Sequence, residues 1–200
     1  MKHDNQKNKK GFIQKSALRE WIDSAVYAFI LFLIIRTFVV QAFKIPTGSM
    51  RPTLKEGDML LVSKFWYGAK IPFTDIRLSG ISHPQRGDVV VFLYPVDKKR
   101  DFIKRLIGLG GDTVEIKNGR IYVNDKVIDD SKISGRFYYN YGGYGGEDKK
   151  IYVPQDSYFV LGDNSKSSHD SRYWGFVPKK YLIGRAFVIY WPLNRIRLIK

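Results

Sequence analysis

One long apolar segment near the N-terminus sets the first constraint on how this chain can fold. The segment covers 23 residues, 21–43, and its two charged members, Asp23 and Arg36, lie towards its two ends. A helix of this length can cross the roughly 30 Å hydrocarbon core of a bilayer. An arginine near one end can extend its guanidinium to the lipid headgroups. We therefore predict a single transmembrane anchor at residues 21–43.

The residues before this segment predict its orientation. Residues 1–20 carry six Lys or Arg side chains and two acidic ones. By the positive-inside rule, this basic tail stays in the cytoplasm and residues 44–200 lie outside it, with the anchor in the cytoplasmic membrane. The alternative is a cleavable signal peptide with Val40-Gln41-Ala42 as its small-residue cleavage site. That alternative would still leave an exported domain.

The composition limits the class of partner and the chemistry. The chain of 200 residues has 34 Lys and Arg against 19 Asp and Glu, a formal net charge of +15. Such an excess favours an anionic partner, either nucleic acid or a lipid headgroup surface. The absence of cysteine excludes disulfides and thiolate metal sites, and the chain has only three histidines. We expect no metal and no cofactor.

Residues 44–200 have the pattern of a mostly β domain. Short runs of β-branched or apolar residues are bounded by Gly, Pro or Asp, and Asn118-Gly119 between two such runs is a strong hairpin signal. We predict a smaller inserted β subdomain at about 113–160, which contains a Gly/Tyr-rich loop at 137–146. Aromatic residues in that loop could stack on bases, but we favour a plain surface loop.

Ser49 follows the predicted anchor closely and is a candidate nucleophile that needs a base. Histidine is poorly placed for this role: His83 lies in a Ser-His-Pro turn, and His169 directly precedes Asp170, so the two point to opposite faces of an extended chain. A lysine with a lowered pKa is the other option. Strand alternation places Lys104 on an apolar face, where the loss of water lowers its pKa. The alternative is a lysine that protects an edge strand.

Four segments strengthen the pairing of Ser49 with Lys104, because they occur in a fixed order after the anchor. The segments are Ile45-Pro46-Thr47-Gly48-Ser49-Met50-Arg51-Pro52-Thr53-Leu54, Arg86-Gly87-Asp88-Val89-Val90-Val91-Phe92, Phe102-Ile103-Lys104-Arg105-Leu106-Ile107-Gly108-Leu109, and Gly162-Asp163-Asn164 followed by Asp170-Ser171-Arg172-Tyr173-Trp174-Gly175. Together they resemble the type I signal peptidase family, the bacterial leader peptidases, from the anchor to about Ala186.

The resemblance implies a Ser/Lys dyad endopeptidase that removes signal peptides from exported preproteins at the outer face of the membrane. Ser49 matches the nucleophile and Lys104 the general base. The Ser49 backbone N–H and the Thr47 hydroxyl match the oxyanion donors, with threonine where the family often has serine. Ser168 matches the hydroxyl that orients the lysine amine.

The resemblance also implies supporting residues. Asp170 matches a structural carboxylate whose expected partners are Arg172 and Arg105. Gly110 stands where the family commonly has proline, and His169 stands at a loosely filled position, so we interpret it as incidental. Candidate linings of shallow apolar substrate pockets are Phe43, Ile45, Met50, Leu54, Phe102 and Ile103.

The expected partners are preproteins and anionic phospholipids, with no nucleic acid. Two alternatives remain open. One is a related Ser-Lys protease with a narrow substrate set. The other is a membrane-anchored basic protein that binds nucleic acid or lipid without catalysis.

Overall fold

The structure, a computed structural model, describes residues 17–71, 74 and 76–199. Most of the predicted basic tail, residues 1–16, lies outside this range. The chain divides into two compact units after Ile35.

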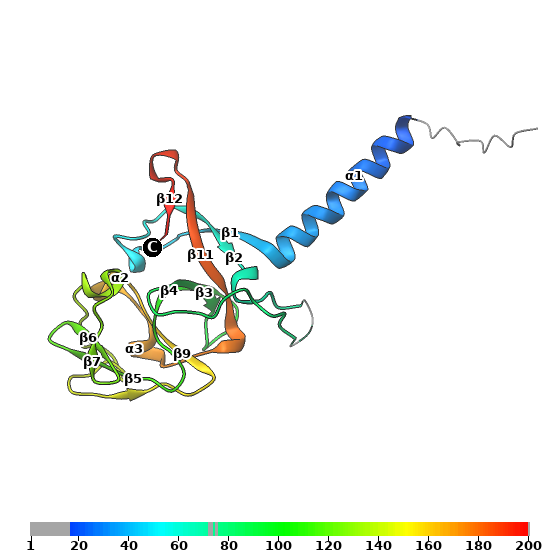
Figure 1. Cartoon of the computed structure of the whole chain (residues 1–200). Helices are drawn as coiled ribbons and strands as arrows, with labels where there is room; N and C mark the ends of the chain where they lie inside the picture. Colours follow the sequence, from blue (N-terminus) through cyan, green and yellow to red (C-terminus); the bar gives the residue numbers. More distant parts are fainter. Residues whose placement is uncertain (1–16, 72–73, 75, 200) are drawn as a thin grey trace, which may run out of the picture. The chain divides into compact units, whose positions relative to one another are not determined.

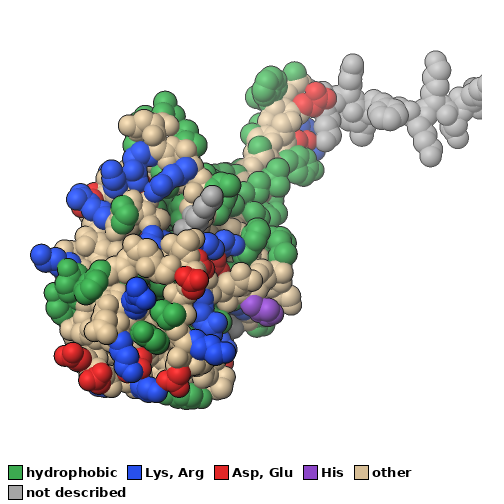
Figure 2. Space-filling view, turned by 60° about the vertical axis from the view of Figure 1, so that its left-hand side comes forward, with side chains coloured by type: hydrophobic (Ala, Val, Ile, Leu, Met, Phe, Trp, Pro, Cys, Tyr) green, Lys and Arg blue, Asp and Glu red, His purple; other side chains and the backbone are tan. Residues whose placement is uncertain are grey.

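The first unit is an apolar helix. Helix α1 spans Ala17–Ile34 and has no buried residue, and a π-helical turn, η1, continues it over Ile35–Val39. The candidate membrane span is Ala17–Val39, with a mean hydropathy of 2.0. Figure 2 shows mostly hydrophobic side chains on its visible face. An N-terminal apolar helix is thus present, as predicted.

This span starts and ends four residues earlier than the predicted one. The reason lies in strand β1, Val40–Lys44, which pairs antiparallel with strand β2, Met59–Ser63, in the register Val40↔Ser63 to Lys44↔Met59. Backbone groups that pair across a sheet cannot also form the hydrogen bonds of a helix. The pairing therefore ends the helical segment at Val39.

The second unit is mostly β, as predicted, and twelve antiparallel strands form two sheets within the described residues (Figure 1). The larger sheet has the order β1-β2-β11-β3-β4-β9-β10, with β12 paired to β11. Its remaining strands are β3 Val89–Leu93, β4 Asp101–Gly108, β9 Ser157–Leu161, β10 Val177–Pro178, β11 Leu182–Trp191 and β12 Arg197–Leu198.

The smaller sheet has the order β7-β6-β5-β8, and Figure 1 shows β5, β6 and β7 gathered at the end of the domain away from β1 and β2. Its strands are β5 Thr113–Lys117, β6 Arg120–Val123, β7 Lys126–Val127 and β8 Ile151–Tyr152. The predicted hairpin joins β5 to β6, with positive φ at both Asn118 (50°) and Gly119 (73°). Because these strands pair among themselves, we propose that they form the inserted subdomain. Its strands occupy residues 113–152, and β9 returns to the larger sheet.

Short helical segments complete the unit. They are η2 Gly48–Met50, η3 Phe65–Tyr67, α2 Ser131–Ser134, η4 Ser165–Ser167, α3 Ser171–Trp174, η5 Lys179–Tyr181 and η6 Leu193–Arg195.

The two sheets share buried side chains. Ile107 of β4 and Phe159 of β9 belong to the same hydrophobic cluster as Ile116 and Ile121 of the smaller sheet. The Gly/Tyr-rich segment is a loop, as predicted, but Tyr138 in it is also buried in this cluster and is only 1% exposed. The loop is therefore part of the core on one side.

Gly110, in the turn after β4, provides a test of this packing. A Cβ at this position would lie 2.0 Å from the Gln155 carbonyl oxygen, a backbone atom that cannot move away cheaply. We expect Gly110→Ala to lower the free energy of unfolding by about 1–3 kcal/mol, measured by chemical denaturation. Gly143→Ala is the matched control, because a Cβ there meets nothing within 4 Å. Equal stability of the two variants would contradict this account of the turn.

Candidate active site

Ser49 is held in a turn that directly follows β1. The neighbouring side chains of Ile45, Met50 and Leu54 are buried in the core, at 3%, 0% and 0% exposure. Their packing holds one side of the turn in place. From the other side, the Asn164 backbone N–H donates to the Ser49 carbonyl (3.0 Å), and its side-chain amide donates to the Gly48 carbonyl (3.1 Å). The core and a distant loop thus fix the backbone of Ser49 together.

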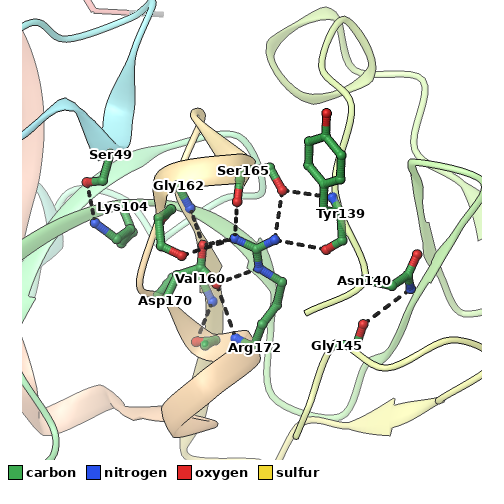
Figure 3. Close-up of polar contacts among 12 residues, drawn as sticks. Ser49, Lys104, Tyr139, Asn140, Gly145, Val160, Gly162, Ser165, Asp170 and Arg172 are labelled. Atoms are coloured by element: carbon green, nitrogen blue, oxygen red, sulfur yellow. Dashed lines mark hydrogen bonds and ion pairs between the residues drawn. The ribbon is translucent and has the colours of Figure 1, made fainter. Parts of the chain in front are cut away.

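Lys104 reaches Ser49 from the middle of the larger sheet. Its strand, β4, lies between β3 and β9, and the pairing with β9 begins at Arg105, the next residue. Lys104 is buried, so the alternative of a lysine that protects an edge strand from solvent is wrong. The Lys104 Nζ lies 2.7 Å from Ser49 Oγ and also donates to the Ile103 carbonyl (3.1 Å) (Figure 3). As strand alternation predicts, the amine shares a face with Phe102, at 5.5 Å from the centre of its ring. The structure therefore brings together the predicted pair.

Burial changes the protonation of this amine. Lys104 is 4% exposed, and the resulting desolvation lowers its pKa to about 8, against the opposing attraction of the Asp170 and Asp163 carboxylates. Each of these carboxylates is already paired with a guanidinium. With a pKa of about 8, about a tenth of the amine is neutral at pH 7, and a lysine acts as a base in this neutral form.

An ion pair without solvent contact supports the wall of the site. Asp170 and Arg172 are both 0% exposed, with Nε to Oδ1 at 2.8 Å and Nη2 to Oδ2 at 2.9 Å. The same guanidinium donates to Ser165 and to the Tyr139 carbonyl (2.8 Å), and Asp170 accepts from the Gly162 N–H (3.0 Å) (Figure 3). The pair therefore joins η4, the Gly/Tyr-rich loop and the residue that follows β9, Gly162.

Arg105 has a different partner from the predicted one. Its Nε and Nη2 each lie 2.7 Å from an oxygen of Asp163, which Arg136 also contacts at 3.1 Å. Of the two expected partners of Asp170, Arg172 is confirmed, whereas Arg105 pairs with Asp163 instead. The register explains this, because Arg105 lies opposite Leu161 on β9, two residues before Asp163.

A cavity of about 410 Å³ opens over Ser49 and Lys104. Thr47 also lines it and is exposed, and its hydroxyl makes no capping hydrogen bond to the turn that follows. Of the six predicted pocket residues, only Phe102 lines this cavity. Three of the others are the buried core residues beneath the turn, and Phe43 and Ile103 pack against that core.

Known proteins resemble most of the chain. The model of the family described as "Signal peptidase, peptidase S26" matches residues 18–191. A probable signal peptidase I-2 of Synechocystis sp. is 42% identical over 90% of this chain and 77% of that protein. The signal peptidase I of Pseudomonas aeruginosa is 37% identical over 80% of this chain and 68% of its own length.

The chain belongs to the signal peptidase, peptidase S26, family. It is therefore a serine peptidase, a hydrolase of peptide bonds, and its family is anchored to membranes. A crystal structure of a signal peptidase I from Enterococcus faecalis is 33% identical, covering 53% of this chain and 98% of that one, with a TM-score of 0.44.

Ser168 lies beside the pair in this signal peptidase, although it does not hydrogen-bond to it. Its hydroxyl is buried and has no hydrogen-bond partner within the described residues. A Cβ on Gly162 would lie 2.1 Å from Ser168 Oγ and 2.5 Å from the Ser49 carbonyl oxygen. Because Gly162 has no side chain, the Ser168 hydroxyl and the Ser49 carbonyl can both lie against its Cα. The sequence did not predict that this position needs a glycine.

Other cavity residues were also missed. His169, which we interpreted as incidental, lines the wall, and its Nε2 lies 3.4 Å from the Tyr94 hydroxyl. Residues that reach the cavity without any prediction from the sequence are Arg51, Glu56, Asn164 and Ser167. Arg51 and Asn164 belong to the ordered segments quoted above, and Ser167 to η4, but nothing in the sequence indicates that these side chains face a cavity.

The burial of Lys104 has a consequence for stability that does not depend on catalysis. Its pKa is about 8 in the folded chain and 10.5 when unfolded, so the unfolded state binds more protons between these values. Below pH 8 the group costs about 3 kcal/mol, and this cost disappears as the pH rises to 10.5. Lys104→Met should therefore stabilise the chain at pH 7 and lose this advantage near pH 10.5, in denaturant titrations at both values. An advantage independent of pH would contradict the lowered pKa.

Proposed function

We propose that this peptidase cleaves signal peptides from preproteins with Ser49 as nucleophile and Lys104 as general base. The observation that carries the proposal is the contact of 2.7 Å between a buried amine and a serine hydroxyl at the floor of an open cavity. A lysine of lowered pKa within hydrogen-bond reach of a serine is the arrangement that activates this nucleophile.

The reaction starts with neutral Lys104. The amine takes the proton of the Ser49 hydroxyl while Oγ attacks the carbonyl carbon of the scissile bond. The Ser49 N–H and the Thr47 hydroxyl donate to the oxyanion that develops. The ammonium then gives its proton to the departing amine of the mature protein, which leaves the signal peptide as an ester on Ser49. Water, deprotonated by the same amine, hydrolyses this ester.

Ser168 and Asp170 have supporting roles in this proposal. A rotation of the unpartnered Ser168 hydroxyl would let it accept a hydrogen bond from the Lys104 amine and direct the nitrogen lone pair at Ser49. The Asp170–Arg172 pair holds the segment that carries Ser168. Asp170 itself, bound by Arg172 and the Gly162 N–H, is not a proton acceptor in the reaction.

We further propose that α1 spans the cytoplasmic membrane with the N-terminus in the cytoplasm, as the basic tail favours. The β domain then lies outside, next to the anionic phospholipids of the membrane. Preproteins anchored by their own signal peptides would meet the enzyme in two dimensions, which raises their effective concentration.

Substitution of the pair tests the proposed chemistry. We expect Ser49→Ala and Lys104→Ala to abolish cleavage of a preprotein whose signal ends in Ala-x-Ala, because each removes a group that forms or breaks a bond. Cleavage is followed by gel shift and by the mass of the released product. His169→Ala is the control and should remain active. Cleavage by both the Ser49 and the Lys104 variants would refute the dyad.

The pH dependence provides a second test. Only the neutral amine can accept a proton, so kcat/KM should rise about tenfold per pH unit below a midpoint near 8 and then level off. The measurement covers pH 6 to 10. A pH dependence that disappears in His169→Ala would assign the base to histidine instead.

The proposed oxyanion donor is tested by a pair of variants at one position. Thr47→Val keeps the shape of the side chain and removes the hydroxyl, so kcat should fall about 10²–10³-fold with little change in KM. Thr47→Ser retains the donor and should remain close to the wild type. If Thr47→Val and Thr47→Ser have the same kcat, the oxyanion is held by other donors.

A further inference from the structure

A second and larger cavity, of about 570 Å³, lies elsewhere on the β domain and shares no lining residue with the cavity over Ser49. Its polar lining is strongly cationic. Lys70, Arg77, Lys179 and Lys180 line it together with His83, and no carboxylate does so within the described residues. A cavity with this charge attracts an anion.

The cationic groups are held in place. The Arg77 guanidinium donates to the Gly68 carbonyl (2.7 Å) and to the Leu182 carbonyl, and it forms no ion pair in the described part of the chain. Among the residues that the structure describes, Lys179 forms one ion pair, at 3.4 Å, with Asp156, whose side chain is 95% exposed. Lys180, at the adjacent position, borders the cavity as well. The phosphate of an ester or diester, an oxyanion with several acceptor oxygens, matches these donors.

The position of the cavity indicates where this phosphate comes from. A neighbouring cavity of about 360 Å³ shares Lys70 and Lys180 with it, and is also lined by Thr37 and Gln41. Thr37 lies in the last turn of the candidate membrane span. Lys64, on the same wall, donates to the Thr37 carbonyl at 3.3 Å. Three lysines, Lys64, Lys70 and Lys180, line this neighbouring cavity against one carboxylate, Asp101, among the described residues. The connected cavities therefore begin where the apolar span ends, which the proposed membrane placement puts at the depth of the headgroups.

The chain between β2 and β3 adds an apolar contribution. It walls the larger cavity and carries large hydrophobic side chains that are exposed, namely Phe65, Trp66, Ile76, Leu78 and Ile81. Apolar side chains beside a cationic cavity suit a ligand with a charged head and acyl chains. A free phosphate would contact only the cationic cavity and not the apolar side chains beside it.

We propose that the cavity lined by Lys70, Arg77, Lys179 and Lys180 binds the phosphate of an anionic phospholipid headgroup, with the exposed apolar side chains between β2 and β3 in contact with its acyl chains. The inference rests on the proposed membrane placement of the chain and not on its cleavage chemistry. It identifies a lipid site that is separate from the peptidase site.

The test uses the full chain in nanodiscs of phosphatidylcholine with one fifth phosphatidylglycerol. After release into detergent, native mass spectrometry counts the retained lipids. Each lysine next to an anionic headgroup strengthens binding about five-fold, so Lys179→Gln/Lys180→Gln should retain phosphatidylglycerol about 30-fold more weakly. The matched control is Lys126→Gln/Lys149→Gln, which removes the same charge from exposed lysines elsewhere and should retain the lipid like the wild type.

The outcomes separate the possible sources of the phosphate. Equal retention by both double variants overturns the proposal. Displacement of the lipid by millimolar glycerol phosphate, with the same loss in Lys179→Gln/Lys180→Gln, would assign the cavity to a soluble anion and also overturn it. Ser49-dependent cleavage of a preprotein in lipid-free detergent is measured in parallel. Failure of that cleavage would count against the proposed function and leave the lipid result standing.

Discussion

The buried pair of Asp170 and Arg172 is the interaction on which the rest of the site depends. Removing two charges from water is costly, and an ion pair compensates for this cost only when its geometry is good and the remaining donors and acceptors are used. Here the guanidinium also binds Ser165 and the carbonyl of Tyr139, and the carboxylate binds the Gly162 N–H. The pair thus fixes a segment without regular structure, and a rigid segment is needed to hold Ser49 and Ser168 in position.

The same pairing determines the electrostatics at Lys104. Two carboxylates lie close enough to favour its charged form, and alone they would keep the lysine protonated. Each is bound to a buried arginine, Asp170 to Arg172 and Asp163 to Arg105. The attraction felt by the amine is therefore weakened, and desolvation prevails. The site obtains a neutral amine from the balance of these two effects and needs no cofactor in the proposed reaction.

Sequence patterns predicted the local features of this chain well. The apolar helix, the strands and the hairpin at Asn118-Gly119 follow from composition, alternation and turn chemistry, which act over a few residues. The apolar face of Lys104 also follows from alternation. The ion-pair partner of Arg105 could not be predicted in this way, because the register between β4 and β9 decides which carboxylate lies opposite the guanidinium. Three of the predicted pocket residues, Ile45, Met50 and Leu54, lie in the core beneath the turn. Apolar residues suit both a core and a pocket, and their sequence does not distinguish the two.

By itself, the sequence determined an apolar segment next to a basic tail, a β-rich remainder, and the ordered segments that carry Ser49 and Lys104. The tertiary structure decided the chemistry of that pair. The lowered pKa of Lys104 results from the atoms that exclude water from the amine and from the charges that surround it. These groups come from β4, the turn after β1 and the segment after β9. This pKa cannot be predicted from a single stretch of sequence, because desolvation depends on neighbours that only folding brings together.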